Sequence, residues 1–514
     1  MGAYERFRRG AWGDGAAPSC PRLPARAYEH GARSGPAAHN GRVVDRADAV
    51  VVGSGPNGLA AAITLARAGR EVVIYETADR PGGGCRTSEL TLPGVLHDDC
   101  SAVHPMALAS PFFRSVDLAA RGVRWIHPGA PAAHPLDGRP AAILERTVEA
   151  TADRLGQDGA AWRRVFGPLV DDIDKLLPQL LGPVIRVPRH PVALARFGLP
   201  GLLPATTFAR VAFRTREARA LFGGLAAHSI YRLDRPPTAA FGLVFGLVAQ
   251  SLGWPIVEGG SGRLIDALVA ELTALGGRVI TGRRIASLAE VPARTTLLDL
   301  APRGVAEVAG EQLPAAALNG LRRFRYGAGV CKVDWALSGP VPWSDPEITR
   351  AGTVHLGGTL DELRQAEAEV QAGRHADRPF VLFVQPSRFD RSRAPAGVEV
   401  GWAYCHVPRG STVDASSAIE AQVERFAPGF RDLILGRHVR TAADLERYDE
   451  NYVGGDINVG LADLRGVLFR PRAALDPYRL PGEGLFLCSS ATPPGGGVHG
   501  MCGWHAATSA LRAS

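Results

Sequence analysis

The stretch from Asp48 to Glu76, DAVVVGSGPNGLAAAITLARAGREVVIYE, constrains the fold more than any other part of this chain. It begins with β-branched apolar residues from Val50 to Val52, as expected of a strand that is buried on both faces. Three glycines follow in the spacing GxGxxG, and the pattern then predicts a helix from Asn57 to Arg67 that stops at Gly69. A second apolar strand, Val72 to Tyr75, leads to the closing acidic residue. The stretch therefore predicts a strand–turn–helix–strand unit.

This unit is typical of dinucleotide binding. Gly53 permits the tight turn out of the strand, Gly55 lets backbone N–H groups approach a pyrophosphate, and Gly58 lets the helix pack close to the sheet. The dipole and free N–H groups of the helix N-terminus favour negative charge there. Glu76 follows Gly58 by 18 residues, where a carboxylate can accept hydrogen bonds from a ribose hydroxyl. The agreement of both strands, the helix and the acid predicts a bound dinucleotide.

Composition and spacing exclude several other classes of protein. The 514 residues are enough for two or three domains with sizeable cores, and 46% hydrophobic with 21% charged residues is ordinary for a globular protein. The net charge of +7 is not gathered into a dense basic run with interleaved aromatics, so no nucleic-acid partner is expected. The seven cysteines form no CxxC pair, and the histidines and acids between His97 and His104 lack ligand spacing. No metal site is expected.

A second glycine and arginine loop, ADRPGGGCRTSE, follows the first unit directly. It resembles the GG motif of the flavoprotein oxidoreductases in the amine oxidase and phytoene desaturase superfamily. The match is offset, because a third glycine and Cys85 stand where an arginine directly follows the glycine pair in that group. The resemblance implies that Gly83, Gly84, Arg86 and Thr87 line the pyrophosphate and the flavin of FAD.

The C-terminal segment GLFLCSSATPPGGGVHGMCGWHAATSALRAS carries a third motif. It predicts a strand from Leu485 to Cys488, a glycine-rich loop and a helix from about Met501 to Leu511. The loop formally repeats GxGxxG, but too few residues follow for a second strand and acid, so we expect no second complete nucleotide unit. By the superfamily resemblance, Ser490 and the backbone from Gly497 to Met501 contact the phosphate and the flavin ring.

The sequence thus predicts one cofactor site and three catalytic candidates. The cofactor-binding residues are Gly53, Ser54, Gly55, Pro56, Asn57, Gly58, Glu76, Gly83, Gly84, Arg86, Thr87, Ile285, Ser490, Gly497, Val498, Gly500 and Met501; the resemblance places Ile285 or its neighbours at the adenine. His499 in the flavin loop is the best catalytic candidate, with Tyr452 and Asp456 in NYVGGDIN as the others. Each could move a proton, and each can instead serve only as a structural hydrogen-bonding group.

The predicted fold class is α/β, a Rossmann-type FAD-binding domain of the GG-motif flavoproteins with an inserted α+β substrate or cap domain. Residues 1–46 read as a disordered extension. The chain then divides at the boundaries 47–140 for the first FAD-binding part, 141–257 for a helical cap, 258–320 for the second FAD-binding part, 321–470 for a substrate domain with a mixed sheet, and 471–514 for the last FAD-binding part.

Two apolar segments raise the question of a membrane. Residues 176–213 mix apolar residues with arginines, a pattern that suits either a membrane surface or a cap over an apolar cavity. No charged residue occurs between Arg235 and Glu258, but the run contains Gln250, glycines and Pro255, so we expect a buried helix rather than a membrane span. We expect a cytoplasmic protein that takes a small lipophilic substrate, with peripheral membrane association as an open alternative and its oligomeric state undetermined.

Three separated motifs in the right order favour a phytoene desaturase-like oxidoreductase. LPGVLHDDCSAVHP, NYVGGDI and TPPGGGVHG resemble most the branch of proteins like the pyridine nucleotide-disulfide oxidoreductase domain-containing protein 2. The implied reaction is hydride transfer between a carbon of an apolar substrate and flavin N5 of FAD. A redox-neutral isomerase that uses FAD and a non-enzymatic flavin-binding protein remain alternatives.

Overall fold

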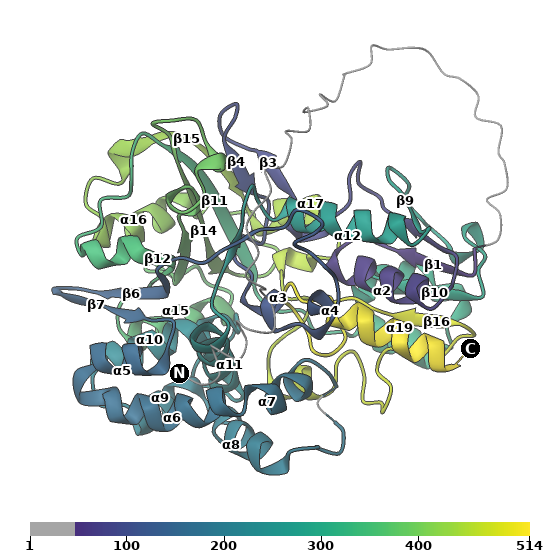
Figure 1. The fold of residues 1–514 in the computed structure, drawn as a ribbon, viewed down its shortest axis with the longest axis horizontal. Coiled ribbons are helices and arrows are strands. Elements are labelled where there is room, and N and C mark those ends of the chain that lie inside the picture. Colours follow the sequence, from purple (N-terminus) through teal and green to yellow (C-terminus); the bar gives the residue numbers. More distant parts are fainter. Residues whose placement is uncertain (1–46, 184, 514) are drawn as a thin grey trace, which may run out of the picture. The chain divides into compact units, whose positions relative to one another are not determined.

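The first sheet of the molecule is built around the predicted nucleotide unit. The computed structural model describes residues 47–183 and 185–513, so the predicted extension over residues 1–46 lies outside the described residues (Figure 1). All strands of this sheet pair in parallel, in the order β16-β10-β1-β2-β9. They are β1 (Ala49–Val52), β2 (Val72–Tyr75), β9 (Arg278–Ile280), β10 (Thr295–Leu298) and β16 (Leu485–Leu487). The predicted first and second strands are confirmed.

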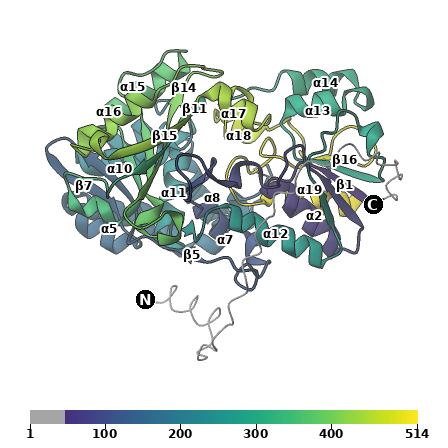
Figure 2. The same cartoon turned by 90° about the horizontal axis from the view of Figure 1, so that it is seen from above.

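Helices cover both faces of the parallel sheet (Figure 2). Val51 points into a core that includes residues of α2 (Pro56–Arg67), α12 (Gly262–Ala274) and α19 (Met501–Ala513). Its neighbours Val50 and Val52 point the other way, into a core with α13 (Pro302–Val308) and α14 (Ala315–Arg322). This alternation is what a strand buried on both faces requires.

Helix α19 approaches α2 at a distance that only glycine permits. A Cβ atom at Gly503 would lie 1.8 Å from the carbonyl oxygen of Asn57. Beside this contact, Asn57 Nδ2 donates a hydrogen bond to Ser490 Oγ at 3.4 Å. The last described helix therefore closes directly on the first nucleotide motif.

A second sheet of seven strands forms the other half of the fold, in the order β15-β11-β14-β13-β12-β6-β7. Its strands pair antiparallel except for β12 with β6, which are parallel. They are β6 (Ala130–Leu136), β7 (Arg139–Leu144), β11 (Gly329–Leu337), β12 (Ala351–Leu356), β13 (Val381–Val384), β14 (Glu399–Val407) and β15 (Ile434–Arg440). The mixed sheet expected for the middle of the chain is confirmed.

Helices also pack on both faces of the second sheet (Figure 1). Leu382 and Trp402 face a core with the helical region, and Trp335 faces the opposite core with α16 (Ser416–Phe426). The helices of the first face are α5 (Val148–Arg154), α6 (Gly159–Asp171), α7 (Ile173–Leu180), α8 (Pro191–Gly201), α9 (Ala205–Ala212), α10 (Arg216–Ala227), α11 (Thr238–Ser251) and α15 (Leu360–Gln371).

Short elements connect the two sheets. They are the hairpin β3 (Thr87–Glu89) and β4 (Leu96–Asp98), the pair β5 (Trp125–Ile126) and β8 (Ile256–Val257), and the helices α3 (Pro105–Ala109), α4 (Pro111–Arg114), α17 (Ala442–Tyr448) and α18 (Leu464–Leu468).

The apolar run before Glu258 forms α11, whose residues are mostly buried, so the expected buried helix is confirmed. In the described part of the chain, no single helix is both long and apolar enough to cross a bilayer. Helices α8 and α9 meet the length and composition requirement only as a pair, with a bend of 104° between them.

Replacing Gly503 tests the α19–α2 contact. We expect Gly503→Ala to lower the free energy of unfolding by about 1–3 kcal/mol, because its methyl group overlaps the Asn57 carbonyl oxygen. Urea denaturation followed by tryptophan fluorescence measures this loss. The matched control is Gly167→Ala inside α6, where a Cβ meets nothing within 4 Å and the change should be neutral or stabilising. Equal effects of the two substitutions would contradict the packing argument.

Candidate functional site

A cavity of about 370 Å³ opens at the carboxyl ends of β1, β2 and β10. This is the edge at which open parallel sheets bind their ligands. Its walls come from the glycine turn after β1, the end of β2, the GG loop, the end of β10 and two later loops. The residues are 52–57, 76–78, 83, 84, 86, 284, 285, 299, 300, 303, 304, 307, 308, 447–452, 459, 489 and 490.

The backbone of the glycine turn is packed so tightly that Gly53 and Gly58 have no room for a side chain. Gly53 has a φ of 101°, and a Cβ there would lie 2.7 Å from the carbonyl oxygen of Asp299. A Cβ on Gly58 would lie 2.1 Å from the Gly53 carbonyl oxygen. Both glycines thus let α2 start immediately at the end of β1, with its N-terminus at the cavity. Of the predicted turn residues, all but Gly58 line the cavity.

Glu76, the acid expected at a ribose, lines the same cavity and is nearly buried. One carboxylate oxygen accepts hydrogen bonds from the backbone N–H and the hydroxyl of Ser54, at 3.0 and 2.5 Å. The other accepts from the N–H of Ala78 at 2.9 Å and pairs with Arg86 Nη2 at 3.4 Å. The acid is therefore held rigidly between the glycine turn and the GG loop.

Asp299 is a member of the site that the sequence analysis missed. It directly follows β10, and its Oδ2 accepts a hydrogen bond from the Gly58 N–H at 2.8 Å, at the N-terminus of α2. Burial, with Asp449 and Glu76 nearby, raises the pKa of this carboxyl to about 7. The sequence does contain a signal for Asp299. An acidic residue directly after an apolar run such as TTLL is expected at the carboxyl end of a strand, which is the sheet edge that binds ligands.

The GG loop is held by two tyrosines that the sequence did not connect with it. Tyr448 donates a hydrogen bond to the Gly83 carbonyl oxygen at 2.9 Å, and the Arg86 guanidinium lies 5.5 Å from the Tyr448 ring. A Cβ on Gly84 would lie only 2.0 Å from the Tyr452 hydroxyl. Tyr452 therefore lies directly against the backbone of the GG loop.

A second cavity of about 300 Å³ adjoins the first. The two share Pro56, Asn57, Gly84, Tyr452 and Ser490. Away from this junction the second cavity is largely apolar and aromatic, with walls that include Ile230, Phe241, Phe245, Trp254, Leu382, Trp402 and Val498. The molecule thus joins a polar cavity at the sheet edge to an apolar one between the two halves of the fold.

The three catalytic candidates have different surroundings. Tyr452 lines both cavities. His499 is buried, with Nδ1 accepting from the Met501 N–H at 3.0 Å and Nε2 bonded to the Gly495 carbonyl oxygen at 3.1 Å. Asp456 is buried too, and its carboxylate accepts from the N–H groups of residues 327, 458 and 460. The bonds of His499 stabilise its own loop, those of Asp456 also join its loop to Gly327, and neither residue lines either of the two cavities. A catalytic role for any of the three stays a prediction.

The other predicted cofactor residues divide in the same way. Gly83, Gly84, Arg86, Ile285 and Ser490 line the first cavity, and Gly497 and Val498 line the second. The Thr87 hydroxyl instead pairs with Asp98 at 2.9 Å and with the Gly262 N–H at 2.9 Å. Gly500 and Met501 pack behind the loop, where Met501 is buried in the core of the parallel sheet.

A chain of histidines behind the apolar cavity was also missed. His228 lines the cavity, and its Nε2 lies 3.0 Å from Nε2 of His355. His134 donates from Nε2 to the Gly358 carbonyl oxygen at 2.6 Å. Burial lowers the pKa of His228 to about 3 and that of His134 to about 4, so both rings are neutral. Within residues 47–183 and 185–513, no group of three His, Cys, Asp or Glu side chains could hold a metal ion.

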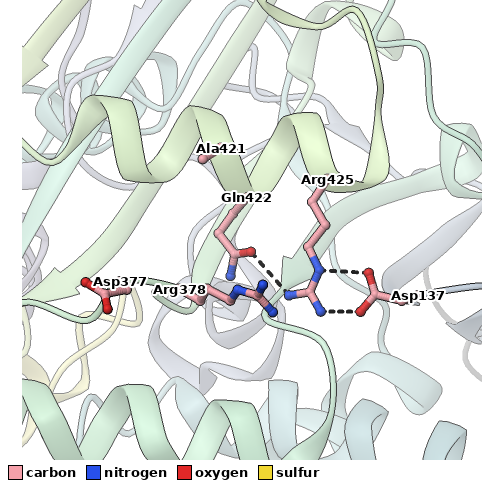
Figure 3. A pocket seen from close by; sticks show the side chains of 6 residues that line it. All are labelled: Asp137, Asp377, Arg378, Ala421, Gln422 and Arg425. Carbon is pink, nitrogen blue, oxygen red and sulfur yellow. Dashed lines mark hydrogen bonds and ion pairs between the residues drawn. The ribbon is translucent and has the colours of Figure 1, made fainter.

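A larger hollow of about 530 Å³ lies beside α16 and contains no residue of the nucleotide motif. Figure 3 shows the side chains that line it. Its main polar groups already pair with each other: Arg425 bonds to Asp137, with Nε to Oδ1 at 2.8 Å, and to Gln422 at 3.4 Å. Asp137 is also largely exposed, and none of the lining residues has a buried polar side-chain atom without a hydrogen-bond partner. Chemistry therefore favours the paired cavities as the candidate site.

Replacing Asp299 by asparagine tests the electrostatics of the site. The folded state favours the protonated carboxyl, so the wild type loses stability as the pH rises from the ordinary pKa of 3.8 to about 7. We expect Asp299→Asn to be more stable than the wild type, with a free energy of unfolding about 1–3 kcal/mol higher at pH 8 and a smaller difference at pH 5. Urea denaturation at both pH values measures this, with the exposed Asp432→Asn as control. A pH-independent difference would refute the raised pKa.

Comparisons with known proteins agree with this geometry. Residues 51–114 match the NAD(P)-binding Rossmann-like domain. The chain is 26% identical to pyridine nucleotide-disulfide oxidoreductase domain-containing protein 2 of Rattus norvegicus, over 91% of this chain and 94% of that protein. It is 32% identical to hydroxyneurosporene desaturase of Cereibacter sphaeroides, over 52% of this chain and 54% of that protein.

Solved structures share the fold. An oxidoreductase from Methanosarcina mazei has a TM-score of 0.58 at 15% identity, over 90% of this chain and 99% of that chain. Putrescine oxidase bound to putrescine has a TM-score of 0.57 at 16% identity, over 91% and 99%. The chain is thus homologous to pyridine nucleotide-disulfide oxidoreductase domain-containing protein 2 and to desaturases, and it shares the fold of amine oxidases.

Proposed function

We propose that this chain is an FAD-dependent oxidoreductase that moves a hydride between a carbon of an apolar substrate and flavin N5. The observation that carries the proposal is the junction of a polar, glycine-lined cavity with an aromatic one at Gly84, Tyr452 and Ser490. A molecule with a polar nucleotide half and a planar aromatic half matches this change in lining. The substrate then occupies the apolar end.

The residues of the first cavity fit FAD. Asn57 leaves its Oδ1 buried and without a hydrogen-bond partner among the described residues, beside the N-terminus of α2. Gly53 and Gly55 carry no side chain, so the backbone of the turn can approach a pyrophosphate closely. Glu76 would hold the ribose, Ile285 the adenine, and Gly84 with Ser490 the region nearer the flavin.

When bound, FAD supplies the group that accepts or donates the hydride, and the protein supplies position and environment. The aromatic wall excludes water from the reacting carbon. Burial raises the pKa of Tyr452 well above its usual range, so the phenol keeps its proton and can donate a hydrogen bond at the junction. We therefore propose Tyr452, of the three predicted candidates, as the group that contacts the reactants.

The visible spectrum of the protein tests the cofactor. The purified chain, reconstituted with FAD, should show bound-flavin absorption, and Glu76→Ala should weaken FAD binding about 10- to 100-fold, because a charged hydrogen-bond acceptor is lost. The matched control is Glu71→Ala, an exposed glutamate at the start of β2, which should bind FAD like the wild type. A wild type that stays colourless with FAD added would overturn the proposal. Product formed without reduction of an acceptor would favour an isomerase instead.

We propose further that the region of α8 and α9 lies against an anionic membrane surface. Several large apolar side chains are exposed there: Ile185, Val187, Val192, Leu199, Leu202, Leu203 and Val211. No acidic residue occurs from 175 to 216, whereas six arginines do, which favours anionic lipid. Gly201 of α8 packs against Ala240, next to the cavity residue Phe241, so this surface adjoins the apolar cavity.

Vesicle flotation tests this surface. The wild type should float with vesicles that contain phosphatidylserine and much less with pure phosphatidylcholine vesicles. The double variant Val187→Asp and Val211→Asp should lose most of the binding, because its side chains, 90% and 82% exposed, cannot then enter the interface. Leu475→Asp, which is also 90% exposed but lies elsewhere, is the control. Equal flotation of all three proteins would contradict the proposal.

A further inference from the structure

Arg470 is a buried arginine without a carboxylate partner. Three arginines are buried in the described part of the chain: Arg86, Arg393 and Arg470. Arg86 pairs with Glu76 at 3.4 Å, and Arg393 pairs with Asp98 and Asp390, both at 2.9 Å. No acidic oxygen among the described residues lies within 4.0 Å of the Arg470 guanidinium. Because buried charges are ordinarily paired, this exception requires a reason.

The hydrogen bonds of Arg470 use only part of its guanidinium. Nε donates to the Gly466 carbonyl oxygen at 2.8 Å, and Nη1 donates to the Ser490 carbonyl oxygen at 3.2 Å. No described residue is hydrogen-bonded to Nη2. This nitrogen is not fully enclosed by the protein, since Arg470 is absent from the residues with enclosed and unpartnered polar atoms. Since Arg470 lines the second cavity, its free donors are accessible from that cavity.

The two carboxylates whose charge acts on Arg470 are engaged elsewhere. Asp456 accepts three backbone N–H groups, and Asp463 pairs with Arg325 at 2.7 Å and accepts from the Gly466 N–H. Both favour the charged guanidinium only from a distance. The cavity therefore carries a positive charge that the described protein groups do not neutralise by contact.

We propose that Arg470 is an anion site, and that the reactants bring its counter-charge into the cavity. This inference rests on the proposed function and extends it to the chemistry of the ligand. An anionic group can come from two sources: a carboxylate on an otherwise apolar substrate, or the flavin itself when it is reduced to its anion. Arg470 lies against the C-terminal glycine loop. It donates to the Ser490 carbonyl oxygen, and a Cβ on Gly495 would lie 2.6 Å from its Nη1.

The first arm of the test uses octanoate and 1-octanol, which share an apolar chain and differ in charge. Binding to the full-length protein is followed by the tryptophan emission, since Trp254 and Trp402 line the cavity. If the substrate supplies the anion, the wild type binds octanoate more tightly than octanol. Arg470→Met then loses about tenfold or more of the octanoate affinity and keeps the octanol affinity, while Arg470→Lys retains part of the preference.

The second arm measures the midpoint potential of bound FAD by dye-coupled reduction. If the reduced flavin supplies the anion, Arg470→Met shifts the potential to lower values, because the reduced state loses its counter-charge. Arg470→Lys should shift it less. Arg472→Met, an exposed arginine two residues away, removes the same charge outside the cavity and should leave both measurements unchanged.

The inference is overturned if Arg470→Met changes neither the octanoate preference nor the potential, or if Arg472→Met changes them equally. Arg470→Gln serves the same comparison if the methionine variant does not fold. A wild type without bound FAD overturns the proposed function separately, because the octanoate arm is also measured on the FAD-free chain.

Discussion

The contact between α19 and α2 is the constraint on which the rest of the site depends. It brings the last glycine-rich loop against the first one, so that the Asn57 amide reaches Ser490 across 433 residues of sequence. Without a side chain at Gly503, the two helices meet backbone to backbone. Asn57 and Ser490, which meet at this contact, both line the junction of the two cavities.

The two cavities differ in how their charges are balanced. In the first, acids and bases are paired or hydrogen-bonded: Glu76 with Ser54 and Arg86, and Asp299 with the start of α2. In the second, His228 and Tyr452 are neutral, and Arg470 has hydrogen bonds to backbone carbonyl oxygens but no contacting carboxylate among the described residues. The polar groups of the first cavity are thus already arranged for binding. In the second cavity, the charge of Arg470 is balanced by contact only when a ligand brings a negative charge.

Sequence reasoning predicted what is local. The first strand, its helix, the second strand and the acid occupy fewer than thirty residues, and each position follows from backbone geometry or burial. The strand and helix of the C-terminal motif were equally predictable from the sequence. Tyr448 and Arg470 were not, because their roles arise from contacts across the fold. Asp299 has one local signal, the acidic residue directly after the run TTLL, but its contact with α2 comes from across the fold. The His228–His355 pair joins residues 127 apart, one directly after α10 and one in β12, and no local sequence pattern indicates it.

The long reach of the α19 contact has a consequence for synthesis. The strands and helix of the nucleotide unit leave the ribosome early, whereas the loop and helix that complete the site are the last described elements to be made. The parallel sheet itself cannot be finished until β16 joins β10. Such non-local pairing is slow and leaves an open sheet edge during translation. The candidate nucleotide site of this fold is therefore complete only after these last described elements have been made and have paired.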